Sequence, residues 1–163
     1  PHDADISIAR SLQHIDDVEG ALVARALRAG LICADAAPDT FEVETLAHAI
    51  ARVHALQIQL DEAAQQPLHS FLRGQLIVPL AYALTRHPET VQPLIDAHDE
   101  AALTAFLHTQ AILSACREIQ ATAYETALRH IATIPTATTR TWLTALLPHN
   151  EAHVQTQSHT VAS

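Results

Sequence analysis

The sequence predicts an all-α protein, arranged as a single antiparallel bundle of about five to seven helices. Only 3 of the 163 residues are glycine, which disfavours a turn-rich all-β fold. Apolar residues make up 48% of the chain and charged residues 17%, a composition typical of a packed domain and not of a disordered chain. Apolar side chains also recur at steps of three and four residues, the spacing of one helix face.

The first half of the chain predicts two helical segments. The first covers residues 4–29 as one helix or two, because Asp16 and Asp17 are suited to cap a second helix, and Gly30 is expected to end it. The second follows a capping box at residues 39–42 and runs to about Ala64. The positions of its expected buried seam are Leu46, Ile50, Val53, Gln57 and Leu60.

The middle of the chain predicts a proline-kinked helix. Pro67 suits the first turn of this helix, which is expected to stop before Pro88. Pro79 lies inside it and lacks the backbone N–H of a normal helical residue, so we expect a kink over residues 75–79. A short helix over residues 89–97 is expected to follow.

The last third predicts one long central helix. We expect Asp99 to cap this helix, which meets no glycine or proline before Pro135 and would span roughly 50 Å. A short helix around residues 142–147 is expected to end at Pro148. We therefore expect a helical bundle domain over residues 1–148 and a polar, flexible C-terminal tail over residues 149–163.

The charge balance limits the partners of the protein. There are 18 acidic and 9 basic residues, giving a net charge of −9, so nucleic acids and anionic membranes are disfavoured as partners. The apolar runs are too short to predict a membrane span. The chain has 12 histidines, the one side-chain type whose unperturbed pKa lies between about pH 5 and 8, so we expect solubility and association to depend on pH.

Lysine and methionine are both absent, and cysteine is rare. A GC-rich coding bias explains the missing lysines, and selection against lysine modification in a protein delivered into a host cell is the alternative. Cys33 and Cys116 have no CxxC spacing, and we expect both to be small buried side chains. A cytoplasmic location is the resulting expectation, with a delivered or secreted protein left open.

Motifs that would identify an enzyme are missing. The chain has no GxxxxGK[ST] phosphate loop, no GxSxG elbow and no HExxH zinc helix, and without lysine it cannot form a lysine Schiff base. Glu44, His48 and Arg52 form a polar stripe on one helix, which we interpret as a solvated face. No catalytic residue or metal ligand is predicted, and the sequence does not determine whether a cofactor binds.

The candidate ligand-binding residues are histidines and charged residues beside apolar stripes. Residues near the expected kinked helix suit a His/Arg-lined pocket. An Arg–Glu pair within the long helix would contribute to a pocket if that helix is central, and would otherwise face solvent. The full set of candidates is His54, His69, Arg73, His108, Arg117 and Glu118.

Three function classes follow. The first is a non-enzymatic module that docks a protein partner or self-associates, and it predicts an exposed apolar patch. The second is a small-molecule or metal-binding helical protein, which predicts a mixed-polarity pocket between helices. The third is an enzyme with His/Glu acid–base chemistry, which predicts a histidine paired with a carboxylate inside that pocket.

Overall fold

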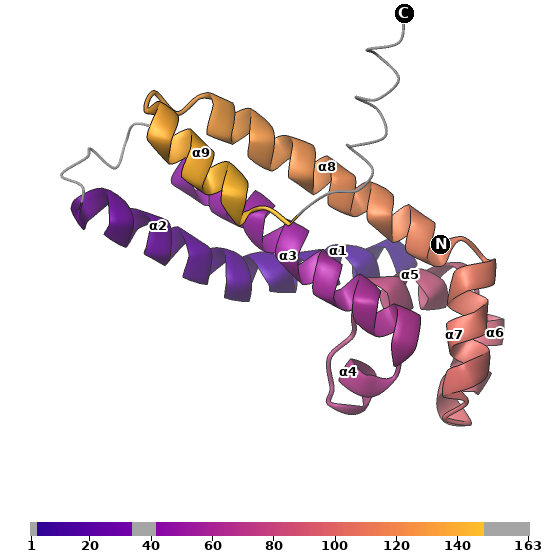
Figure 1. Ribbon diagram of the computed structural model, residues 1–163. Helices are drawn as coiled ribbons and strands as arrows, with labels where there is room; N and C mark the ends of the chain where they lie inside the picture. Colours follow the sequence, from indigo (N-terminus) through magenta and orange to yellow (C-terminus); the bar gives the residue numbers. More distant parts are fainter. Residues whose placement is uncertain (1–2, 34–41, 149–163) are drawn as a thin grey trace, which may run out of the picture.

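The computed structural model describes residues 3–33 and 42–148, and its secondary structure in these ranges is entirely helical, as predicted (Figure 1). Within the described part of the chain, no helix is both long and apolar enough to cross a lipid bilayer. The elements in chain order are α1 (Asp3–Ile15), the π-helical turn η1 (Asp16–Gly20), α2 (Ala21–Cys33), α3 (Val43–Gln65), α4 (His69–Leu72), α5 (Val78–Arg86), α6 (Pro88–Asp96), α7 (Glu100–Thr109), α8 (Ile112–Ala132) and α9 (Ala137–Leu146).

Helix α3 runs through the middle of the molecule and organises its packing. It contacts η1 and α2 on one side and α8 along another, an arrangement visible in Figure 1. Its expected seam is buried at Leu46, Ile50, Val53 and Leu60, whereas Gln57 is half-buried and bonds the side chain of Asp61. Because several faces of α3 are covered, its apolar stripe is wider than one seam.

The N-terminal segment forms two α-helices joined through η1 without a break in the chain direction. In a π-helical turn each N–H bonds a carbonyl five residues back, so one extra residue is accommodated and the following helix face is rotated. The expected stop at Gly30 is wrong, because α2 continues to Cys33.

The expected kinked helix is instead two helices, α4 and α5, separated by residues 73–77. Gly74 has a φ of +80°, a conformation that glycine adopts without a Cβ clash. Pro79 lies in the first turn of α5, where its missing N–H costs no helical hydrogen bond. The side chain of Gln59 accepts a hydrogen bond of 2.9 Å from the backbone N–H of Val78, which further secures the start of α5.

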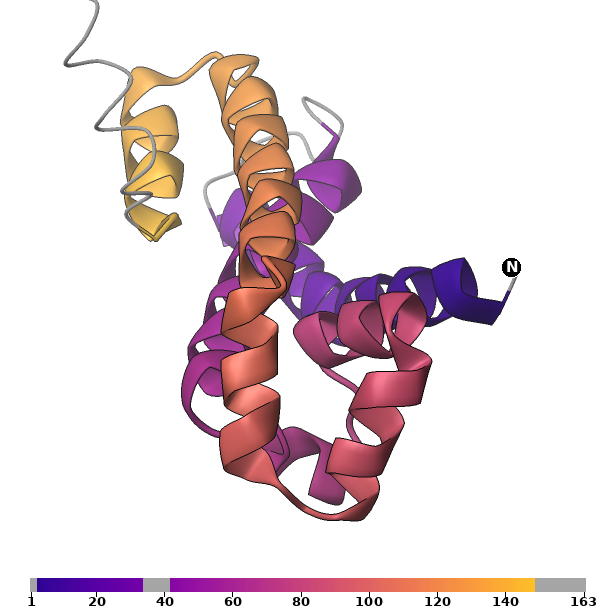
Figure 2. The same cartoon turned by 90° about the vertical axis from the view of Figure 1, so that its right-hand side faces the viewer.

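The prediction of one long central helix is also wrong. Ala111 has a φ of +54°, which ends α7 before it and starts α8 after it. Helix α7 packs against α6 and the end of α3, whereas α8 packs along α3. Figure 1 shows the change of direction between the two helices, whereas in the view of Figure 2 one lies almost directly above the other. One straight helix could not pack on both surfaces. The packing therefore breaks the helix at Ala111, although the local sequence, without glycine or proline, favours a continuous helix.

Other sequence-predicted boundaries hold. The side chain of Asp99 accepts a hydrogen bond of 3.0 Å from the backbone N–H of Ala102, and so caps α7 as predicted. Helix α9 ends at Leu146, two residues before Pro148. The start of the capping box at residues 39–41 and the expected tail at residues 149–163 lie outside the described residues.

The buried apolar side chains form two clusters. The larger joins α3 to α5, α6, α7 and the start of α8, and its fully buried members include Leu56, Leu80 and Leu103. The smaller joins the start of α3 to the end of α8 and to α9, around Leu46 and Ile131. Helix α3 contributes to both clusters, so its position fixes the surfaces that lie beside it.

Candidate functional site

Two open grooves border α3. The first, which we call the α1–α3 groove, has a volume of about 640 Å³. The second, the α3–α8 groove, has a volume of about 530 Å³. Both volumes fall within the range of about 300–1,000 Å³ typical of ligand pockets, but both sites are open to solvent along one side.

The α1–α3 groove combines aliphatic and charged side chains from three parts of the chain. Its walls come from α1 and η1, from the second half of α3, and from the segment between α4 and α5. The lining residues are Arg10, Ser11, His14, Ile15, Glu19, Ala55, Ile58, Gln59, Glu62, Ser70, Gly74, Gln75, Leu76 and Ile77.

Some polar groups in this groove are used to hold its walls together. The carboxylate of Glu62 accepts hydrogen bonds from the backbone N–H and the hydroxyl of Ser70, at 2.7 and 2.9 Å. The hydroxyl of Ser11 donates to the carbonyl oxygen of Leu76 at 3.1 Å and ties α1 to the α4–α5 connection. These contacts connect the three walls and define the groove.

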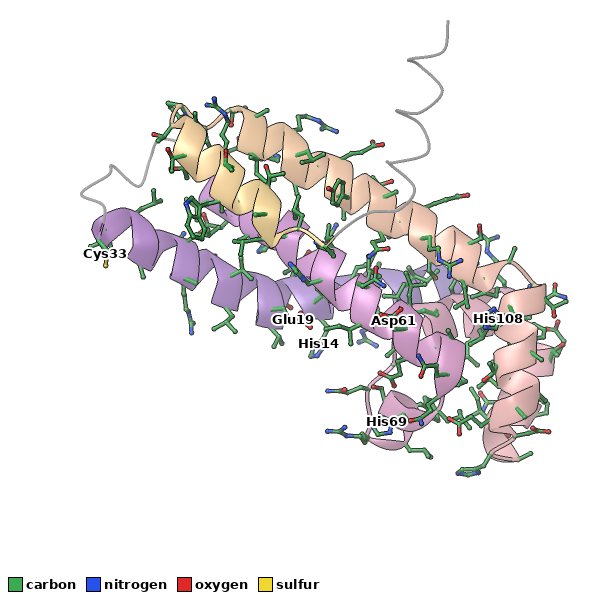
Figure 3. The ribbon with its side chains drawn as sticks, viewed as in Figure 1. His14, Glu19, Cys33, Asp61, His69 and His108 are labelled. Atoms are coloured by element: carbon green, nitrogen blue, oxygen red, sulfur yellow. The ribbon has the colours of Figure 1, made fainter. Side chains whose placement is uncertain are left out.

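Three other polar groups are available to a ligand. Arg10, His14 and Glu19 make no hydrogen bond or ion pair with any other described side chain. Burial raises the pKa of the Glu19 carboxyl, while the nearby imidazoles of His14 and His54 oppose that rise. Figure 3 shows His14 and Glu19 close together beside α3. The two side chains interact electrostatically but are not hydrogen-bonded to each other.

Exposed apolar side chains are also present on α9, which a hydrogen bond links to α3 near this groove. Ile58 and Leu76 line the groove and are 65% and 36% exposed. One turn before Ile58, the Nε2 atom of His54 lies 2.7 Å from the carbonyl oxygen of Leu146. Leu146 is 53% exposed, and Trp142, one turn earlier on α9, is 70% exposed. We call these four residues, Trp142, Leu146, Ile58 and Leu76, the apolar row.

The α3–α8 groove has a different character. Its lining residues are Glu44, Thr45, His48, Ala49, Arg52, Ile119, Thr122, Ala123 and Thr126. Ala49 and Ala123 are buried, and the hydroxyls of Thr122 and Thr126 donate to carbonyl oxygens of their own helix. Arg52, His48 and the hydroxyl of Thr45 are therefore the side-chain donors available in this groove, and Arg52 is the permanently charged one.

The side chains of Arg52 and His48 are held in place by η1. The Nε and Nη2 atoms of Arg52 donate to the two carboxylate oxygens of Asp16, at 2.8 and 2.5 Å. The Asp16 side chain is only 8% exposed, so the pair is shielded from water on the Asp16 side. Gly20 lies against the ring of His48, and a Cβ at that position would be 2.5 Å from the His48 Cδ2 atom.

A second ion pair lies at the edge of this groove. Arg28 of α2 pairs with Glu44 of α3, and both side chains are about half exposed. The sequence-based interpretation of Glu44, His48 and Arg52 as a solvated face is therefore incomplete, because His48 is half-buried and Arg52 binds a buried carboxylate. The partners of this stripe lie 16–36 residues away in the chain, so residue spacing along one helix cannot identify them.

The six sequence-predicted site residues are not brought together. His54 is half-buried against α9, and His69 bonds Arg73 across one turn, at 3.2 Å, on an exposed surface. Figure 3 shows His69 and His108 on separate elements. The other candidates are also exposed: Arg73, His108, Arg117 and Glu118. None of the six candidates, His54 and His69 included, lines either groove.

The cysteines differ from each other. Cys116 is buried as predicted, and burial raises the pKa of its thiol to about 12. Cys33 is exposed at the end of α2, which corrects the prediction that both are buried. In the described part of the chain, no three histidine, cysteine or acidic side chains gather as a metal site.

Sequence reasoning missed Arg10, His14, Glu19 and Asp16. Arg10 and His14 are four residues apart on α1, which places them on one helix face, and this spacing could have identified them as a pair.

Comparison of the chain with protein-family models, curated proteins and solved structures found no match.

Proposed function

We propose that the protein is a non-enzymatic binding module that docks an amphipathic helix of a basic protein partner along the α1–α3 groove and the apolar row. The observation that carries this proposal is the apolar row beside an open groove. Large exposed apolar side chains grouped around a groove are typical of helix-in-groove recognition.

The apolar row offers anchors for the apolar face of the partner helix. Trp142 and Leu146 are one turn apart on α9, and Ile58 lies one turn beyond His54, which contacts Leu146. Aromatic residues are over-represented among the side chains that dominate binding energy. Trp142 is the residue that we expect to contribute most.

The charge beside the groove favours a basic partner. The carboxylates of Glu19 and Glu62 line the groove. Arg10 is the arginine in the lining, so carboxylates outnumber guanidinium groups there. The whole chain has a net charge of −9, which attracts a basic partner at long range and repels a second copy of itself.

Two peptide probes test the proposal. The first is an amphipathic helix of leucine and lysine of about 15 residues, or four turns, and the second replaces every lysine with glutamate. Fluorescence anisotropy should show binding of the basic peptide and at least tenfold weaker binding of the acidic one. The double substitution Ile58→Ser and Leu146→Ser should weaken binding of the basic peptide about tenfold or more.

A matched control separates docking from general attraction between opposite charges. Leu72 is 62% exposed on α4 but does not line the groove, so Leu72→Ser should leave the affinity unchanged. Equal effects of Leu72→Ser and the double substitution would contradict the proposal.

Self-association is the alternative occupant of the same surface. Sedimentation of the wild-type protein would then show a dimer that Ile58→Ser and Leu146→Ser dissociate. That result would replace docking of a basic partner with pairing of two copies.

A further inference from the structure

We infer that the α3–α8 groove is a second binding site, and that it takes a small monocarboxylate with an apolar body, whose carboxylate is bound by Arg52. This site does not depend on the docking surface described above, since the two grooves share no lining residue.

The orientation of Arg52 is the first support. Its Nε atom and one N–H of Nη2 are used by Asp16, and a guanidinium has five N–H donors. The remaining donors, including both on Nη1, are left for the groove that Arg52 lines, and the side chain is 39% exposed. An arginine held on one edge by a buried carboxylate loses less side-chain entropy when it binds a second acceptor.

The π-helical turn is the second support. The two buried residues of η1 are Asp16 and Gly20, and they contact the two groove residues Arg52 and His48. An ion pair with a buried member is an expensive way to stabilise a fold, since apolar residues of the same volume often do as well. Pi-helical turns frequently occur at functional sites. Here the turn fixes the two side chains that face the groove.

The shape and remaining chemistry of the groove determine the rest of the ligand. Ile119, Ala49 and Ala123 provide an aliphatic surface, and the hydroxyls of Thr122 and Thr126 already donate to their own helix. The groove thus offers one oriented cationic donor group beside an apolar surface. That combination suits a ligand with a single anionic head group.

The local charge is consistent with a monoanion. Asp16 neutralises Arg52 and Arg28 neutralises Glu44, so the groove has no net charge while His48 is neutral. Arg52 is the one arginine in the lining, so its free donors can match one carboxylate but not the second charge of a dianion. A cationic ammonium head group has no acceptor for the hydrogen bonds that the guanidinium donates.

Three probes with the same six-carbon chain test the head group: hexanoate, hexanamide and hexylamine. Each is titrated into ¹⁵N-labelled protein, and amide shifts are followed. We expect hexanoate to shift amides of α3 and α8 around Arg52 and Thr122 in a saturable way. Hydrogen bonds to a charged acceptor are stronger than those between neutral groups, so hexanamide and hexylamine should bind about tenfold more weakly or worse.

Two variants test the site. Arg52→Gln should weaken hexanoate binding about tenfold, with Arg129→Gln on the exposed side of α8 as the charge-matched control. Because Arg52→Gln leaves Asp16 unpaired and is able to unfold the protein, Thr122→Leu serves as a second variant that fills the groove from its exposed rim. Thr141→Leu is its control, since Thr141 on α9 is also exposed and also bonds its own helix.

The outcomes are distinct. Loss of hexanoate binding in Thr122→Leu, with full binding in Thr141→Leu, supports the site. Equal affinity for hexanamide, preference for hexylamine, shifts that map away from α3 and α8, or no saturable binding would each overturn it. None of these outcomes depends on whether a peptide binds at the α1–α3 groove.

Discussion

Replacing Arg52 with alanine should destabilise the protein far more than replacing Arg28 with alanine. Both arginines pair with a carboxylate, but Asp16 is buried with 8% of its side chain exposed, whereas Glu44 is 54% exposed. Removing one member of a buried pair costs about 3–5 kcal/mol, because the other charge stays buried without a partner. Exposed pairs contribute about 0–1 kcal/mol.

The expected loss is at the lower end of the buried range. Arg52 is 39% exposed, so water replaces part of the lost interaction, and we expect a destabilisation of about 3 kcal/mol. For a domain of this size 1 kcal/mol shifts Tm by about 2–4 °C, so Tm should fall by roughly 6–12 °C. The Arg28→Ala variant should lose at most about 4 °C.

Urea unfolding followed by circular dichroism measures both free energies of unfolding. Similar losses for Arg52→Ala and Arg28→Ala would refute the reasoning, because they would mean that Asp16 is not shielded from water. The Asp16→Asn, Arg52→Ala double variant provides a further check. It should recover much of the lost stability, since it removes the unpaired charge.

Three further outcomes follow from single residues. Gly20→Ala should lower the free energy of unfolding by about 1–3 kcal/mol, because the new Cβ overlaps the ring of His48, and thermal melts measure this. Ala111→Gly should raise the free energy of unfolding by about 1 kcal/mol, because the left-handed conformation at this position is unfavourable for alanine but not for glycine. The absence of any stabilisation would mean that α7 and α8 are continuous. The thiol of Cys33 should react with a disulfide reagent in the folded protein, whereas that of Cys116 should react only after unfolding, because burial raises the pKa of the Cys116 thiol to about 12. Fast reaction of both thiols in the folded protein would contradict the burial of Cys116.

The sequence predicted the helical class and most of the helix positions, because these depend on spacing along the chain. The seam of α3 was predicted from its steps of three and four residues, and the Asp99 cap from residue type. The break at Ala111 was missed because alanine favours helix, and only packing of α7 and α8 on different surfaces explains it.

The candidate sites were harder to predict than the fold. Asp16 and Arg52 are 36 residues apart, and nothing in their local sequence indicates that they pair. Of the three histidines singled out from the sequence, His69 and His108 lie on exposed surfaces, and His54 is half-buried against α9. Arg10 and His14 were overlooked, although their spacing places both on one helix face. Contacts between helices, which carry both grooves, depend on how the helices are oriented by the whole core.

The docking proposal is tested most directly by mapping the bound leucine–lysine helix on ¹⁵N-labelled protein. We expect amide shifts at Ile58, Leu76, Trp142 and Leu146 and along the α1–α3 groove, with a side-chain shift of the Trp142 indole. Shifts spread evenly over acidic surfaces, or confined to the α3–α8 groove, would contradict docking at the apolar row.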